Sequence, residues 1–267
     1  MIPICIPTYK HPRYDFIDKV LTSKYFANRK FKKPVYYFIY DIDWDSFKIE
    51  DYLDKFEEIH FVKVPFQSYA KAMRMRVFIQ LYMTNLNMDY FWMLDNDICQ
   101  NITCMDRELH RMVQKPIDEV LEYIESFRRD NILIMGPSNR WTAPLSSKTD
   151  SDLDEGKSIP IQCILLNNKE LNKLGINYTG DISVCEDAEI CIRCIDKGYD
   201  CRMLKSFVYH TASNMATNNW YNLNEIVKNT YQKYKHTGLV ELGQTKRGAN
   251  IIKISRARSL KHLRRLW

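Results

Sequence analysis

Short apolar runs alternate with amphipathic stretches along the first hundred residues of the chain. The apolar runs are rich in β-branched and aromatic residues, and polar or turn residues follow each of them. These strand-like runs cover residues 2–7, 35–40, 59–64 and 90–94. Stretches with the apolar spacing of helices cover residues 14–26, 44–56 and 68–84. This alternation predicts an α/β fold in which helices flank a parallel sheet.

The pattern continues after residue 100 and is interrupted by one long polar loop. We expect a helix near 116–129 and two further strands at 131–137 and 161–167. Between these strands we expect residues 138–158 to form a mobile loop beside an acceptor site, because long loops in compact domains are often binding segments. Arg140 and Trp141 would offer a stacking surface for a base or a sugar. Alternatively, Trp141 only anchors the loop to the core.

Polar side chains follow several of the predicted strands. In a parallel α/β sheet, ligands bind beyond the carboxyl ends of the strands, and such positions are held by Thr8, Asp41, Asp43, Asp95 and Asp97. In YFWMLDNDICQ, residues 90–100, Asp95 and Asp97 flank Asn96 directly after a strand. Carboxylates of this kind suit Mg²⁺ or Mn²⁺, with phosphate oxygens completing the shell. The alternative is an ordinary solvated turn, which Asp and Asn favour.

A second pair of acids opens a predicted helix that ends before Gly198. Glu186 and Asp187 begin this helix, where negative charge is favourable without any function. Asp187 would also project toward the sheet end, where a carboxylate could accept the proton of an acceptor hydroxyl. His210 closes a strand-like FVYH run and becomes a candidate third metal ligand if the acids lie close to it.

In their order along the chain, these motifs resemble a GT-A fold nucleotide-sugar glycosyltransferase over residues 1–212. The motifs are a strand before PTY, a strand-end Asp, an Arg-bearing helix, LDND, ED and VYH. Arg76 on its helix, FWMLDNDI, NILIMGP and NYTGDISVCEDAEICIR most resemble the TET/JBP-associated glycosyltransferases of bacteriophages, which modify hydroxymethylated pyrimidines in DNA. The resemblance implies a single-domain, Rossmann-like GT-A fold with a mixed, mainly parallel sheet.

The resemblance also implies roles for individual residues. Asp97 would bind the Mn²⁺ or Mg²⁺ ion with Asp95, and His210 would complete the metal shell. Asp187 would be the catalytic base, with Glu186 beside it as the other candidate. The nucleotide of a UDP-sugar would be held by Pro7, Thr8, Tyr9, Asp41, Asp95, Asn96 and one of Arg74 and Arg76.

The net charge of +6 is concentrated at the end of the chain. Residues 253–267, KISRARSLKHLRRLW, contain six Lys or Arg and no acid. We call this segment the basic tail, and we expect residues 213–267 to be a helical and basic extension beside the catalytic domain. The tail would contact DNA phosphates or an anionic membrane surface, or would pack as an amphipathic helix. The candidate phosphate contacts are Arg256, Arg258, Lys261, Arg264 and Arg265.

Composition indicates an ordinary globular protein with 45% hydrophobic and 27% charged residues. No run of eighteen apolar residues occurs, and the eight cysteines lie mostly in apolar runs typical of reduced core thiols. We therefore expect a cytoplasmic protein, in the host cytoplasm if a phage encodes it.

The leading hypothesis is a metal-dependent, inverting transfer of a sugar from a UDP-sugar to a hydroxymethylated base, such as 5-hydroxymethylcytosine, in DNA. One alternative is a glycan, lipid-linked or protein acceptor, with the tail on a membrane surface. Another is a non-catalytic GT-A-like protein that binds nucleic acid.

Overall fold

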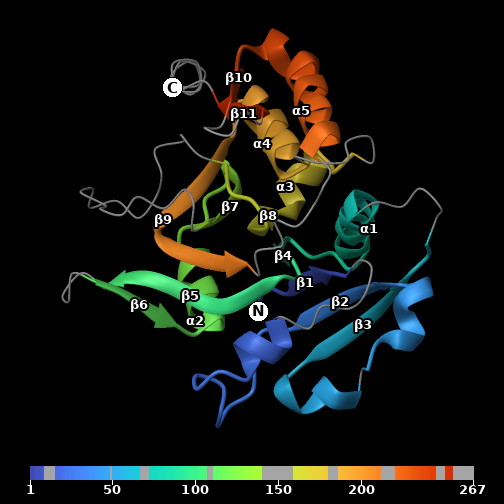
Figure 1. The fold of residues 1–267 in the computed structure, drawn as a ribbon, viewed down its shortest axis with the longest axis vertical. Coiled ribbons are helices and arrows are strands. Elements are labelled where there is room, and N and C mark those ends of the chain that lie inside the picture. The colour runs from blue at the N-terminus through green and yellow to red at the C-terminus, as the bar shows by residue number, and fades with distance from the viewer. Residues whose placement is uncertain are drawn as a thin grey trace.

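A nine-stranded sheet forms the centre of the computed structural model, in the order β3-β2-β1-β4-β8-β7-β9-β5-β6 (Figure 1). The structure describes residues 1–8, 16–48, 50–66, 72–106, 111–139, 159–179, 186–211, 220–244 and 250–254. The strands of this sheet are β1 (Ile4–Pro7), β2 (Val35–Tyr40), β3 (Ile59–Val64), β4 (Tyr90–Leu94), β5 (Ile98–Asp106), β6 (Arg111–Lys115), β7 (Ile132–Asn139), β8 (Cys163–Asn167) and β9 (Asp200–Thr211).

Most strands of the sheet run in one direction. The pairs β1–β2, β2–β3, β1–β4 and β7–β9 are parallel. Strand β8 is antiparallel to both of its neighbours, β4 and β7, and β5 is antiparallel to both β9 and β6. Among the described strands of the sheet, β8 and β5 therefore run against the rest, which confirms the mixed, mainly parallel sheet.

Helices cover both faces of the sheet, and the sequence of β2 shows why. Successive side chains of a strand point to opposite faces, and all six residues of β2 are buried. Val35, Tyr37 and Ile39 join one core cluster, which the π-helix Phe16–Leu21 and α2 (Ile117–Glu125) complete. The intervening residues join a second cluster, which is covered by α1 (Ala72–Asn85), α3 (Asn168–Lys173) and α4 (Glu186–Asp196).

Two of the predicted helices were wrong in type. The described part of 44–56 has no α-helix; it lies mostly in two 3-10 helices, Asp41–Ser46 and Glu50–Lys55. Asp41 gives a physical reason, because its carboxylate accepts hydrogen bonds from the backbone N–H of Ile42 at 2.8 Å and of Phe66 at 2.9 Å. Such side-chain bonds to the backbone compete with an α-helix. Of the described part of 14–26, only Phe16–Leu21 is helical, and turns follow it.

The C-terminal extension packs against α4. It contains α5 (Trp220–Tyr234), a short 3-10 helix (Lys235–Thr237) and a hairpin of β10 (Val240–Gln244) and β11 (Asn250–Ile254), which the sequence analysis did not predict. The buried carboxylate of Glu189 on α4 accepts hydrogen bonds from Lys233 at 2.8 Å and from the hydroxyl of Tyr234. None of the described helices combines the length and the apolar character needed to cross a membrane.

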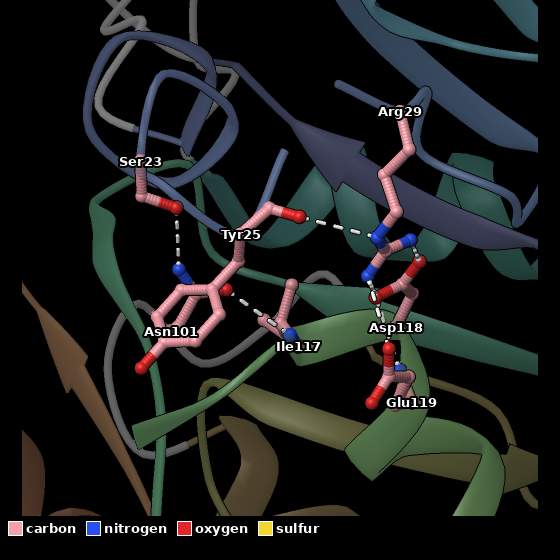
Figure 2. Close-up of polar contacts among 7 residues, drawn as sticks. All are labelled: Ser23, Tyr25, Arg29, Asn101, Ile117, Asp118 and Glu119. Atoms are coloured by element: carbon pink, nitrogen blue, oxygen red, sulfur yellow. Dashed lines mark hydrogen bonds and ion pairs between the residues drawn. The ribbon is translucent and has the colours of Figure 1, made fainter. Parts of the chain in front are cut away.

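A cluster of polar contacts ties the segment after the π-helix to β5 and α2 (Figure 2). Arg29 donates two hydrogen bonds to the carboxylate of Asp118, at 2.6 and 2.9 Å, and one to Glu119 at 3.3 Å. We call these three residues the Arg29 clasp. Next to it, Asn101 on β5 donates to the Ser23 hydroxyl at 2.8 Å and accepts from the N–H of Ile117 at 3.1 Å. These contacts hold the start of α2 against segments distant in the sequence.

Candidate active site

A buried arginine on α1 gathers three acids at the carboxyl end of the sheet. The Arg76 guanidinium contacts Asp95 through Nη2 at 2.5 Å, Asp187 through Nη1 at 2.7 Å and Glu186 through Nε at 3.3 Å. We call these four residues the acid cluster. Asp95 follows the buried strand β4, and the other two acids open α4. The fold therefore brings together the two acidic motifs that the sequence analysis singled out.

Asp187 is held from several sides and is 5% exposed. Its Oδ1 accepts hydrogen bonds from Arg76 and from the hydroxyl of Tyr178, which lies 3.0 Å away. Its Oδ2 accepts from the backbone N–H of Gln162 at 2.9 Å. These three donors hold the carboxylate in place and stabilise its negative charge.

Gln162 connects the two acidic motifs through its backbone. Its carbonyl oxygen accepts from the N–H of Asp95 at 2.8 Å, while its own N–H binds Asp187. Its φ is 61°, in the left-handed region that residues other than glycine rarely adopt. The side chain is fixed as well, since the Tyr209 hydroxyl donates to its Oε1 at 3.1 Å. Backbone strain of this kind tends to occur at functional sites.

Sequence reasoning assigned no role to Gln162 or Tyr178. Tyr178 lies inside NYTGD, one of the segments that carry the family resemblance. The sequence therefore marked this segment but did not indicate what Tyr178 does in it. Nothing in the local sequence singles out Gln162, because its importance comes from a positive φ and from hydrogen bonds to distant residues.

Negative charge exceeds positive charge in the acid cluster. Burial raises the pKa of Asp95 to about 7, although Arg76 opposes this effect, and the neighbouring acids raise it further. Burial also raises the pKa of Glu186, again against the effect of Arg76. Burial lowers the pKa of Arg76, but the three acids more than compensate and raise it well above its usual value. A charged guanidinium therefore faces three acidic side chains, two of which have raised pKa values.

Other predicted site residues lie around the ends of the strands. Thr8 is buried after β1 and donates its hydroxyl to the carbonyl of Phe38 at 2.8 Å. Pro7 ends β1, Asp41 follows β2, and Asn96 and Asp97 form the half-buried turn between β4 and β5. Arg74 lies on α1, with a side chain outside the described part. The other predicted residues outside the described ranges are Tyr9, Arg140, Trp141, Arg256, Arg258, Lys261, Arg264 and Arg265.

The predicted metal ligands do not form a three-ligand group in this structure. In the described ranges, no set of three or more His, Cys, Asp or Glu is arranged to hold a metal ion. His210 on β9 lies with its Nε2 2.8 Å from the Thr103 hydroxyl. The charge of Asp97 raises the pKa of Asp95, as expected for neighbouring carboxylates. Two carboxylates fit Mg²⁺ or Mn²⁺, because such ions are often bound by one or two carboxylates together with substrate phosphates.

Solved structures that this chain resembles have low sequence identity to it. The 1–349 fragment of S. aureus TarS is 10% identical with a TM-score of 0.49, and the match covers 98% of this chain and 69% of the fragment. The same fragment in complex with UDP is 11% identical with a TM-score of 0.49, covering 98% of this chain and 70% of the fragment. The apo form of the glycosyltransferase GlyE in Streptococcus pneumoniae TIGR4 is 16% identical with a TM-score of 0.36, covering 66% of this chain and 36% of GlyE.

The sequence itself identifies the family. No curated protein matches the chain significantly. A family profile described as TET-associated glycosyltransferase matches residues 16–219, which are more than half of the chain and include the whole acid cluster. The chain therefore belongs to the TET-associated glycosyltransferase family and is a glycosyltransferase.

Proposed function

We propose that this enzyme transfers a sugar from a UDP-sugar to the hydroxyl of a hydroxymethylated pyrimidine, such as 5-hydroxymethylcytosine, in DNA, with inversion at the anomeric carbon. The observation that carries the proposal is the acid cluster, in which Asp95, Glu186 and Asp187 converge on Arg76 at the carboxyl end of the sheet. This is the edge where α/β sheets bind ligands.

On the donor side, the ends of β1, β2 and β4 would bind the nucleotide. The loop of residues 7–9 and Asp41 would hold the uridine, and Asp95 would lie near the ribose, as the family resemblance implies; Asn96 would also contact the nucleotide. Asp97 and Asp95 would hold a Mg²⁺ or Mn²⁺ ion, which neutralises charge on the leaving diphosphate. For His210 Nε2 to join the metal, its contact with Thr103 would have to break.

On the acceptor side, the start of α4 would supply the base. A carboxylate there would accept the proton of the acceptor hydroxyl, a contribution typically worth about 10²- to 10⁴-fold in rate. DNA as the acceptor is supported by the family resemblance and by the basic tail, whose charges suit phosphates. Arg140 and Trp141 would contact the acceptor base.

The first experiment compares acceptors and metals. Transfer from UDP-sugars is measured by mass spectrometry on duplexes that differ only in 5-hydroxymethylcytosine or cytosine, with Mn²⁺ or with EDTA. We expect modification of the hydroxymethylated duplex alone, in the presence of metal. Transfer only to a glycan, lipid-linked or protein acceptor would reject the DNA proposal. Undiminished transfer in EDTA would reject the metal.

The metal assignment is tested by Asp97→Ala. We expect loss of metal-dependent transfer with an unchanged melting temperature, because Asp97 lies in a half-buried turn outside the core clusters. Asp45→Ala is the matched control, since Asp45 is an exposed acid on the 3-10 helix Asp41–Ser46. Normal turnover of Asp97→Ala with an unchanged metal requirement would remove Asp97 from the metal site.

The DNA contact of the tail is tested by changing charge alone. Lys253 and Ile254 pair with Glu241 and Val240 in the β10–β11 hairpin, so the change should begin after them. Replacing Arg256, Arg258, Lys261, Arg264 and Arg265 with Gln keeps the chain length. Each phosphate contact contributes about 0.9 to the slope of log affinity against log salt. We expect the slope to fall by roughly three units while donor hydrolysis is retained; an unchanged slope would assign the tail to another role.

A further inference from the structure

We infer that Gln162 is a positioning residue, whose strained turn sets the geometry between Asp95 and Asp187 for sugar transfer. This inference rests on the proposed function, in which these acids belong to the metal site and to the site of proton transfer. Gln162 acts through the two acids rather than on the substrate. The conformation of its backbone, the partners of that backbone and the contacts that hold the turn all support this role.

The backbone at Gln162 forms a tight three-residue turn. The N–H of Cys163 donates to the carbonyl of Ile161 at 2.6 Å, which closes a γ-turn with Gln162 at its centre. Its central φ of 61° makes this the positive-φ form of the turn, which is rare and strained. Among the described residues other than glycine, Asn87 also has a positive φ, of 54°, but it lies in an exposed turn and asparagine is enriched in this conformation. Glutamine has no such preference, so its surroundings must impose the conformation.

Both backbone polar groups of Gln162 bond to acids of the acid cluster. The N–H donates to Asp187 Oδ2 at 2.9 Å, and the carbonyl accepts from the N–H of Asp95 at 2.8 Å. These acids come from different elements, the start of α4 and the end of β4. A change in the backbone angles of Gln162 would move its N–H and its carbonyl relative to each other. The shape of the turn therefore sets how the two acids lie relative to one another.

Two further contacts hold the turn in its strained form. The Tyr209 hydroxyl donates to Gln162 Oε1 at 3.1 Å, and Tyr209 directly precedes His210, the predicted third metal ligand, on β9. The backbone of β7 also passes very close to the turn, because a Cβ atom on Gly136 would lie 2.2 Å from the carbonyl oxygen of Cys163. Strained backbone persists only where the surrounding structure over-determines it, and such places cluster at active sites.

Gln162→Gly separates the shape of the turn from the stability of the fold. Glycine adopts a positive φ without strain, which offsets the lost contact with Tyr209, so we expect a melting temperature close to that of the wild type. The turn is then free to change shape. We expect kcat for donor hydrolysis to fall about 10²-fold, the cost of displacing reacting groups by about 1 Å. The donor KM should change less, because the ends of β1 and β2 that would hold the uridine are untouched.

Asn87→Gly is the matched control. It removes the other positive-φ strain, in an exposed turn after α1 that has no contact with the acid cluster among the described residues. We expect its melting temperature to be unchanged or higher and its kcat to equal that of the wild type. This control shows what relief of backbone strain does when no proposed site depends on the turn.

Gln162→Met and Tyr209→Phe test the contact that holds the turn. Methionine keeps the length of the side chain but accepts hydrogen bonds only weakly, and phenylalanine keeps the ring without the hydroxyl. Each variant should lower kcat by a similar factor, smaller than that of Gln162→Gly. The double variant should lose no more than either single variant, because both changes break one contact. Fully additive losses would show that the Tyr209 hydroxyl does not act through the turn.

Several results would overturn the inference. One is a wild-type kcat in Gln162→Gly; others are a loss that lies wholly in KM or that disappears at temperatures where the variant is folded. If Gln162→Gly does not fold, a wild-type kcat in both Gln162→Met and Tyr209→Phe would overturn it. Donor hydrolysis uses water as the acceptor, so failure of the DNA proposal is seen separately: the wild type would then hydrolyse the donor without modifying hydroxymethylated DNA.

Discussion

Two arginines each form an ion pair with a different aspartate at almost the same distance, but the surroundings of the two pairs differ. Arg29 Nη1 lies 2.6 Å from Asp118, and Arg76 Nη1 lies 2.7 Å from Asp187. In the Arg29 clasp, the arginine is 26% exposed and its second acid, Glu119, is 60% exposed. In the acid cluster, the arginine is 4% exposed and faces three acids, none of which is more than 22% exposed.

The difference lies in charge balance. In the clasp, one guanidinium matches one buried carboxylate through two hydrogen bonds, and the extra acid remains in water (Figure 2). In the acid cluster, the extra acids are largely buried, and burial raises the pKa of Asp95 and Glu186. A buried excess of like charge opposes folding. Strongly perturbed groups of this kind occur preferentially at functional sites, which supports the proposed role of the acid cluster and assigns none to the clasp.

The largest effect is expected for Arg76→Met. It leaves three acids without their counter-charge, and removing one partner of a buried ion pair costs about 3–5 kcal/mol. Urea denaturation should show this loss of unfolding free energy, and donor hydrolysis should be abolished. If the variant instead folds normally and only its donor KM rises, Arg76 contacts the nucleotide, as the family resemblance allows.

Arg29→Met is expected to have a smaller effect, which is confined to stability. The Asp118 side chain is 3% exposed and loses two hydrogen bonds from a charged donor. Each such bond contributes at most about 1.5–3 kcal/mol to stability. The loss is smaller where water replaces the donor. We expect a loss of about 2 kcal/mol in urea denaturation, with kcat of the folded protein unchanged. A large fall in kcat at a temperature where the variant is folded would show that the clasp also positions the site.

Double variants sharpen the contrast further. Replacing both partners of a buried ion pair by apolar residues is often nearly neutral, so Arg29→Met with Asp118→Leu should regain most of the stability lost in Arg29→Met. In Arg76→Met with Asp187→Leu we expect donor hydrolysis to stay abolished, because Asp95 and Glu186 still lack their counter-charge. Recovery of turnover in this second pair would make the acid cluster a structural ion pair like the clasp.

The smallest effect is expected for Glu119→Ala. Its contact with Arg29 is 3.3 Å long and largely in water, and exposed ion pairs typically contribute 0–1 kcal/mol. We expect a change of less than about 0.5 kcal/mol in unfolding free energy and no change in turnover. A loss as large as that of Arg29→Met would mean that the clasp depends on its exposed acid rather than on Asp118.

Much of the sheet could be predicted from local patterns. The strands expected at 35–40, 59–64 and 90–94 agree with β2, β3 and β4 at both ends. Buried strands of this type consist of apolar and aromatic runs that end at polar residues, and both features are local. Strands β5 and β6 were not predicted, because segments such as Ile98–Asp106 mix polar and apolar residues and pair at the far edge of the sheet.

By itself, the sequence determined the strand-end acids, the acidic start of α4 and the family, because these depend on residue type and order along the chain. Only the tertiary structure decided how the acids are paired. Asp187 meets Arg76 across 111 positions of the chain, and the N–H of Gln162 reaches the same carboxylate from another loop. Local spacing cannot specify such contacts, because they form only when the packed sheet and helices bring distant segments to one edge.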